Sequence, residues 1–165
     1  MIAPLPHTAP NTALSPQEQQ ALASDPAFSV WVTASAGSGK TTVLVGRILR
    51  LLLPSPDLSR PGVPPHRILA ITYTRAAAAH MNNKIQERLS QWAVWDDARL
   101  REDLARLINE EPSDDFISHA RGLFANILEQ AQGLQIHTIH AFCQSVLARF
   151  PLEANLSPGF DVMDE

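Results

Sequence analysis

The chain has 165 residues, of which 45% are hydrophobic, and a formal net charge of −4. This length fits one globular domain, and the apolar content is sufficient to bury a core. The first residues lack the basic and apolar stretches of a secretory signal, and no segment is long and apolar enough to span a bilayer. A single cysteine, Cys143, excludes an internal disulfide and argues against a cysteine-based zinc site. The composition therefore predicts a cytoplasmic protein.

The negative net charge argues against nucleic-acid binding, because contacts to phosphates need lysine and arginine. Many of the acidic residues, however, lie in one block between positions 96 and 115. Outside this block the charge is close to balanced, so local sites rather than the total must decide the question.

Three β-like runs divide the chain, and a helical pattern follows each of them. Residues 1–14 are rich in proline and are predicted to be a disordered lead-in. The β-like runs occupy residues 28–34, 67–74 and 134–140. Strands that alternate with helices predict an α/β fold, in which helices flank a parallel sheet.

The first helical pattern begins at residue 40. We expect one apolar face, formed by Leu44, Ile48, Leu51 and Leu52, and an end at Pro54.

The later helical patterns fill the space between the second and third β-like runs. The helix that begins after residue 74 carries an apolar stripe of Met81, Ile85 and Leu89. Two further helices are predicted at about 97–109 and 113–132, within a helical insert at about 93–132. Gly133 is a natural stop for the second of these.

Residues 34–42 read ASAGSGKTT and match a phosphate-binding loop, G-x-x-x-x-G-K-[ST], except that alanine occupies the first position. Glycines in such a loop let backbone N–H groups point at a phosphate, and the N-terminus of the following helix adds its positive end. Lys40 would supply a cation to the β- and γ-phosphates of ATP, and the Thr41 hydroxyl would bind Mg²⁺, which makes these two the candidate catalytic residues. The predicted nucleotide-binding residues of the loop are Ala34, Ser35, Ala36, Gly37, Ser38, Gly39, Lys40, Thr41 and Thr42.

The loop resembles the nucleotide motif of superfamily 1A DNA helicases, the UvrD/PcrA/Rep class, and further stretches support this resemblance. QQALAS places Gln20 and Ala23 at the spacing of the family's Q motif. The resemblance implies that Gln20 binds adenine, for which its amide offers a donor and an acceptor together. The alternative for Gln20 is an ordinary glutamine on a helix surface.

Two more stretches resemble the family motifs Ia and Ib, which contact single-stranded DNA. AITYTRAAAAHM and LQIHTIHAFC end at the second and third β-like runs. The resemblance implies DNA contacts from the ends of both strands, with Tyr73 stacking on a base. From the residues alone, Tyr73 would instead be the buried end of a core strand. The predicted DNA-binding residues are Thr72, Tyr73, Thr74, Arg75, Thr138 and His140.

Within this superfamily the chain most resembles AddA-type helicase–nuclease subunits of double-strand break repair, from about residue 15 to its end. The resemblance implies the N-terminal portion of a partial RecA-like P-loop domain, truncated before the Walker B motif. It further implies binding of single- and double-stranded DNA, 3′–5′ movement driven by ATP, an AddB-type partner, and a nuclease domain beyond this segment. Asp164 and Glu165 superficially match a Mg²⁺-binding strand, but Asp161 interrupts the apolar run before them. We expect the segment alone to be inactive.

Two alternatives remain open at the level of sequence. A small P-loop kinase would fit the length, and Arg99, Arg101 and Arg106 could belong to its lid. A non-enzymatic nucleotide-binding module, whose acidic insert docks a partner, would fit the charge distribution. Neither explains the TYTRAAAAHM and TIHAF stretches.

Overall fold

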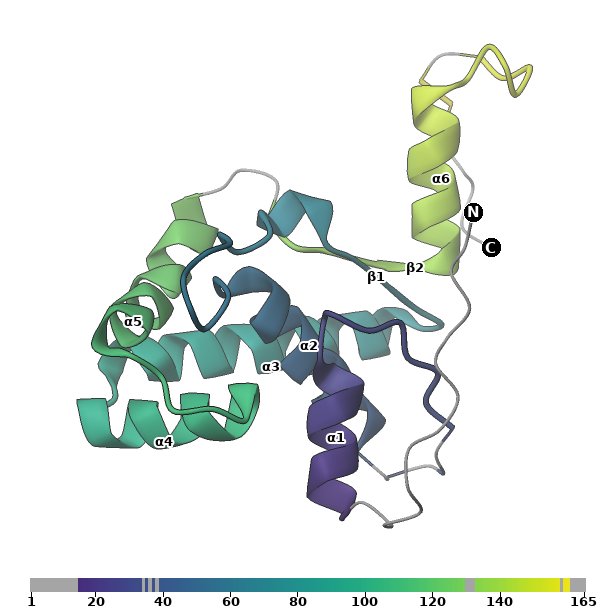
Figure 1. Cartoon of the computed structure of the whole chain (residues 1–165). Helices are drawn as coiled ribbons and strands as arrows, with labels where there is room; N and C mark the ends of the chain where they lie inside the picture. Colours follow the sequence, from purple (N-terminus) through teal and green to yellow (C-terminus); the bar gives the residue numbers. More distant parts are fainter. Residues whose placement is uncertain are drawn as a thin grey trace.

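The computed structural model describes residues 15–33, 35, 37, 39–129, 133–157 and 159–160. The predicted lead-in at 1–14 and the Asp164–Glu165 pair lie outside these residues. Most of the described chain is helical, and one small parallel sheet accompanies the helices (Figure 1). In chain order the elements are α1 (Pro16–Ser24), α2 (Lys40–Leu52), η1 (Pro65–Arg67), β1 (Leu69–Thr72), α3 (Arg75–Val94), α4 (Asp97–Ile108), α5 (Asp114–Glu129), β2 (Gln135–Thr138) and α6 (Ile139–Arg149).

Strands β1 and β2 pair in parallel, with Leu69 opposite Gln135 and Thr72 opposite Thr138. The connection between them passes through α3, α4 and α5, as a parallel pair requires. The predicted strands at 67–74 and 134–140 are therefore confirmed in their central residues. The second is shorter than expected, because α6 begins at Ile139, so His140 lies in a helix and not at the end of a strand.

The predicted strand at 28–34 is wrong for the part that the structure describes. Residues 28–33 form no strand, and their apolar side chains are exposed, with Trp31 at 93%. A β-like composition favours an extended chain but does not supply a neighbour to pair with. Here the Phe28 carbonyl accepts a hydrogen bond from the Arg47 guanidinium instead of from another strand.

Helix α2 lies in the middle of the helical body and packs against α1, α3 and α4. Ile48 and Leu52 are buried as predicted, but Leu44 is 47% exposed and Leu51 is only half-buried. The predicted single face is wrong because partners surround α2 on several sides. Its buried residues are Val43, Val45, Gly46, Ile48, Leu49 and Leu52.

Helix α3 buries the predicted stripe of Met81, Ile85 and Leu89, one side of a long helix that crosses the body in Figure 1. The stripe continues to Trp92, which is fully buried and donates its indole N–H to Asp103 Oδ2 at 2.7 Å. Arg88 binds the same carboxylate through two nitrogens, at 2.9 and 2.7 Å. This charge-assisted bridge joins α3 to α4.

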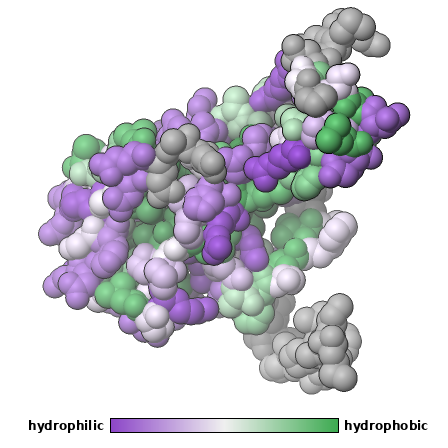
Figure 2. All heavy atoms as spheres, turned by 90° about the horizontal axis from the view of Figure 1, so that it is seen from above, coloured by the Kyte–Doolittle hydropathy of each residue, from purple (hydrophilic) through white to green (hydrophobic). Residues whose placement is uncertain are grey.

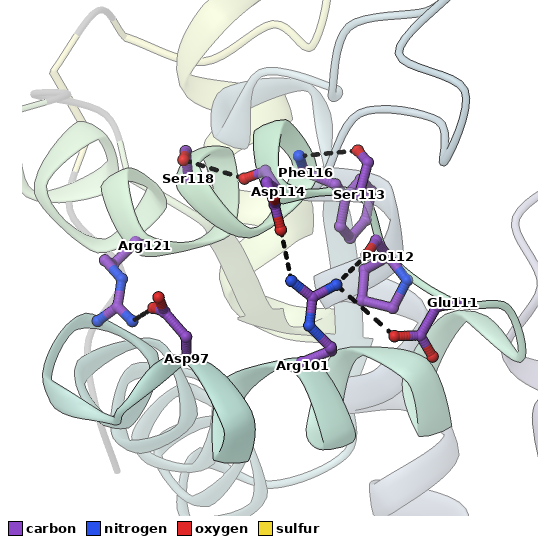
Figure 3. A network of polar contacts seen from close by, with 9 residues as sticks. All are labelled: Asp97, Arg101, Glu111, Pro112, Ser113, Asp114, Phe116, Ser118 and Arg121. Carbon is purple, nitrogen blue, oxygen red and sulfur yellow. Dashed lines mark hydrogen bonds and ion pairs between the residues drawn. The ribbon is translucent and has the colours of Figure 1, made fainter.

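Helices α4 and α5 confirm the predicted helical content of residues 93–129. Arg101 of α4 donates to the Pro112 carbonyl at 2.6 Å and pairs with Asp114 at the start of α5 (Figure 3). In the other direction, Arg121 of α5 donates to the Trp95 carbonyl and pairs with Asp97. Residues 130–132 lie outside the described part of the chain, so the predicted end of α5 there stays a prediction.

Most apolar side chains of the helical body face inward, and Figure 2 shows mainly hydrophilic residues over the viewed face, with hydrophobic ones in the gaps between them. Helix α6 differs, because it projects away from the body (Figure 1) and none of its described side chains is buried. Among the described helices, none has the length and apolar character needed to cross a membrane.

The proline-rich connection after α2 folds back along the end of that helix. Helix α2 ends at Leu52, two residues before Pro54, as predicted. Val63 N–H donates to the Leu51 carbonyl at 2.7 Å, which brings the connection against the helix. A Cβ on Gly62 would lie 2.0 Å from the Leu52 carbonyl oxygen, so only glycine fits at this close approach.

We expect Gly62→Ala to lower the free energy of unfolding by roughly 1–3 kcal/mol, because the added methyl group forces backbone atoms apart. Gly122→Ala is the matched control, since a Cβ there meets nothing within 4 Å and alanine favours the helix. Urea unfolding of both variants checks this, and equal stabilities would contradict it.

Candidate functional site

The glycine-rich loop precedes α2, and its two described glycines have left-handed backbone angles. Gly37 has φ of 77° and Gly39, the N-cap of α2, has φ of 88°. Other residues adopt this region only with strain, so the glycines permit the turn. Ala34, Ala36 and Ser38, which were also predicted to bind nucleotide, lie outside the described residues.

Lys40, the first residue of α2, folds its side chain back over the loop. Its Nζ donates to the carbonyl of Ser35 at 2.6 Å, and the lysine side chain is exposed. The first turn of α2 contains no acidic residue, so nothing there opposes an anion at the positive end of the helix. The left-handed glycines, the lysine cation and the helix N-terminus together fit a phosphate group.

Thr41 and Thr42 follow in the first turn of α2. Thr41 is half-buried, and its hydroxyl could provide one ligand to Mg²⁺, with phosphate oxygens and water completing the shell. No group of three or more His, Cys, Asp or Glu side chains suited to a metal occurs in the described residues. A magnesium ion here would therefore depend on the nucleotide as much as on the protein.

Gln20 reaches the loop from α1. Its Nε2 lies 3.4 Å from the position that a Cβ on Gly39 would occupy. Gln20 and Thr42 also line one cavity of about 830 Å³, which continues past α1 to Arg88 of α3 and the end of α4. The structure thus brings the predicted glutamine beside the predicted loop, where it faces an open cavity.

The second cluster of predicted residues lies at the edge of the sheet where both strands end. Thr72 and Thr138 are register partners, so the segments after them start side by side. Tyr73 is 83% exposed, which excludes the alternative of a buried strand end. Arg75 and His140 are exposed in the first turns of α3 and α6, respectively.

The threonines at this edge begin the helices that follow the strands. Thr74 is the N-cap of α3 and accepts from Ala77 N–H at 3.1 Å, while Thr72 Oγ1 donates to the Thr74 carbonyl. Thr138 is the N-cap of α6 and accepts from Ala141 N–H at 3.2 Å. Each capping oxygen is an acceptor in these bonds, so its own proton remains available for a phosphate oxygen.

Two arginines that no sequence motif had indicated also border the site. Arg47 and Arg50, three residues apart on α2, bind backbone carbonyls of α1 and of the segment after it. Their spacing placed them on one side of the helix, but nothing in the sequence indicated which carbonyls they would meet.

The comparisons with known proteins agree with this geometry. Residues 14–165 match the UvrD/REP helicase N-terminal domain. The chain belongs to the UvrD/REP helicase family. Among curated relatives, two are ATP-dependent helicase/nuclease subunits. The chain is 32% identical, over 90% of its length, to the one from Lactobacillus johnsonii, and 36% identical, over 81%, to the one from Desulforamulus reducens. It spans only 10% and 9%, respectively, of those proteins.

Thr138 offers a test that separates its structural role from any binding role. We expect Thr138→Ala to lower the free energy of unfolding by about 1 kcal/mol, because α6 loses its N-cap. Thr138→Ser keeps the capping oxygen and should unfold like the wild type. Thermal unfolding of the two variants measures this, and a stable alanine variant would show that the cap is dispensable.

Proposed function

We propose that this chain is the nucleotide- and DNA-binding front portion of an ATP-dependent DNA helicase/nuclease. Family membership supports this reading, as do the names of the relatives. The observation that carries it is the register of β1 and β2, which aligns the two motif-bearing strand ends at one edge. Ligands of open α/β sheets bind at this edge of the strands.

At the nucleotide end, the proposal assigns one task to each residue. Bound ATP supplies a phosphoanhydride whose hydrolysis releases free energy. The backbone around Gly37 and Gly39 holds phosphate oxygens, and Lys40 leaves the Ser35 carbonyl to neutralise phosphate charge. Thr41 holds Mg²⁺, and Gln20 binds the adenine edge from α1. Ser35 and Thr42 border these contacts.

At the DNA end, the exposed ring of Tyr73 stacks on a base, and Thr72, Thr74, Arg75, Thr138 and His140 contact the backbone near it. Hydroxyl and cationic side chains of this kind bind phosphates without reading sequence. Single-stranded DNA would therefore lie across the ends of β1 and β2, from the start of α3 to the start of α6.

The remaining features of the proposal rest on the family resemblance. They are a RecA-like P-loop domain into which α4 and α5 are inserted, 3′–5′ movement, and work with an AddB-type partner. The two-stranded sheet and the loop–helix junction before α2 are compatible with part of such a domain.

Replacing Lys40 tests the nucleotide site. We expect Lys40→Ala to weaken binding of Mg²⁺–ATP roughly 10- to 150-fold, because a charge-assisted hydrogen bond to phosphate is lost. Lys84→Ala, which removes a lysine from the middle of α3, is the control and should bind like the wild type. Titration of a fluorescent ATP analogue measures both, and equal affinities would contradict the assignment.

Replacing Tyr73 tests the DNA site and separates a helicase from a metabolite kinase. We expect Tyr73→Ala to weaken binding of single-stranded DNA roughly 5- to 150-fold, through the loss of one stacked base. Tyr73→Phe should retain most of the affinity. Trp31→Ala removes another exposed aromatic ring and should change little.

Fluorescence anisotropy with a labelled oligothymidine gives the affinities. Because Tyr73 is exposed, the alanine variant should unfold within about 0.5 kcal/mol of the wild type. Failure of the wild-type chain to bind the oligonucleotide, together with retained ATP binding, would favour the kinase.

A further inference from the structure

Helix α1 carries Gln20 to the nucleotide loop, yet it has little apolar anchorage of its own. Of its described side chains, Ser24 is the buried one, whereas Leu22 is 52% exposed. The helix has nine residues, a length that is marginal without outside support. Ser15 and Glu18 form a capping box at its N-terminus, so the beginning of α1 is stabilised locally.

The C-terminal end of α1 is held by an arginine of another helix. Arg50 of α2 donates through Nη1 to the Ala21 carbonyl at 3.1 Å, and its Nη2 pairs with the Asp25 carboxylate at 3.1 Å. The Arg50 side chain is only 13% exposed. Ala21 directly follows Gln20, so this contact is made one residue from the glutamine.

Arg47, one turn before Arg50, fixes the segment that leaves α1. Its two terminal nitrogens donate to the carbonyls of Asp25 and Phe28, at 2.6 and 2.8 Å. The backbone between α1 and the glycine-rich loop is thereby tied to the same helix that carries Lys40. Figure 1 shows α1 lying against α2, and the two helices pack together.

The electrostatics explain why an arginine suits this position. The last carbonyls of a helix have no partner within it and carry partial negative charge. The last turn of α1 contains no basic residue that could compensate. Arg50 supplies both the missing donor and the missing positive charge, and it stays partly buried because the Asp25 carboxylate neutralises it.

We infer that Arg50 is a positioning residue for recognition of the base: by holding the end of α1 against α2, it keeps the Gln20 amide beside Gly39. The inference rests on the proposed function, in which Gln20 binds adenine. Arg50 contacts α1 and Asp25, and it acts on the nucleotide only through Gln20. Its loss should therefore change the choice of base without changing the affinity for phosphates.

The experiment compares Mg²⁺–ATP with Mg²⁺–ITP, which differ only at the 6-position of the purine. Because the Gln20 amide can donate and accept together, we expect the wild type to favour ATP by about 3- to 10-fold. Gln20→Ala should abolish this preference. Arg50→Met should reduce it to less than about twofold, with affinity for inorganic tripolyphosphate unchanged, and Arg50→Lys should fall between Arg50→Met and the wild type.

Arg121→Met is the matched control. Arg121 also binds one carbonyl and one carboxylate, those of Trp95 and Asp97, but it joins α4 to α5 (Figure 3). This variant should keep the full preference for ATP. If Arg50→Met does not fold, Asp25→Asn replaces it, because it weakens the ion pair while Oδ1 can still accept from Ala27 N–H.

The possible outcomes separate the inference from the proposed function. A full ATP preference in Arg50→Met and Asp25→Asn, with the preference lost in Gln20→Ala, would overturn the role of Arg50 and leave that of Gln20 standing. No preference in the wild type would overturn both roles. Loss of tripolyphosphate binding in Arg50→Met would show a general structural defect and also overturn the inference.

Discussion

The burial of α2 among three other helices is the constraint on which the rest of the structure depends. Leu49 is fully buried in this helix, and Gly46 lets α1 and α4 approach it, since a Cβ there would lie 3.6 Å from both Ser24 and Leu107. The same helix presents Lys40 at one end and two arginines along its side. Because the core fixes α2, the phosphate loop and α1 are positioned relative to a rigid element.

Hydrophobic patterning predicted the parts of the fold in which a single partner decides burial. The stripe of α3 was predicted correctly because Met81, Ile85 and Leu89 face one continuous core. It failed for α2, where contacts on several sides bury Leu49 and leave Leu44 exposed. It also failed for residues 28–33, since β-like composition reports what a segment favours and not whether a neighbouring strand exists.

The candidate site divides in the same way. The loop and the threonines at the strand ends could be predicted, because local spacing alone defines them. Arg47 and Arg50 could not, because their function is to bind carbonyls that lie about 20 to 30 positions away in the chain. Only the packing of α1 on α2 determines which carbonyls these are. His140 was displaced from the strand for a local reason, since the Thr138 hydroxyl caps a helix that begins at once.

That abrupt junction has a mechanical consequence. Thr138 pairs with Thr72 in the sheet and caps α6 in the same residue, so no loop separates β2 from the helix. With eleven residues, α6 is about 16 Å long, and a rotation of about 10° at its first turn would move its far end by about 3 Å. Helix α6 is thus a lever hinged at the sheet edge, which would convert a small shift of the strand ends into a larger displacement away from the body.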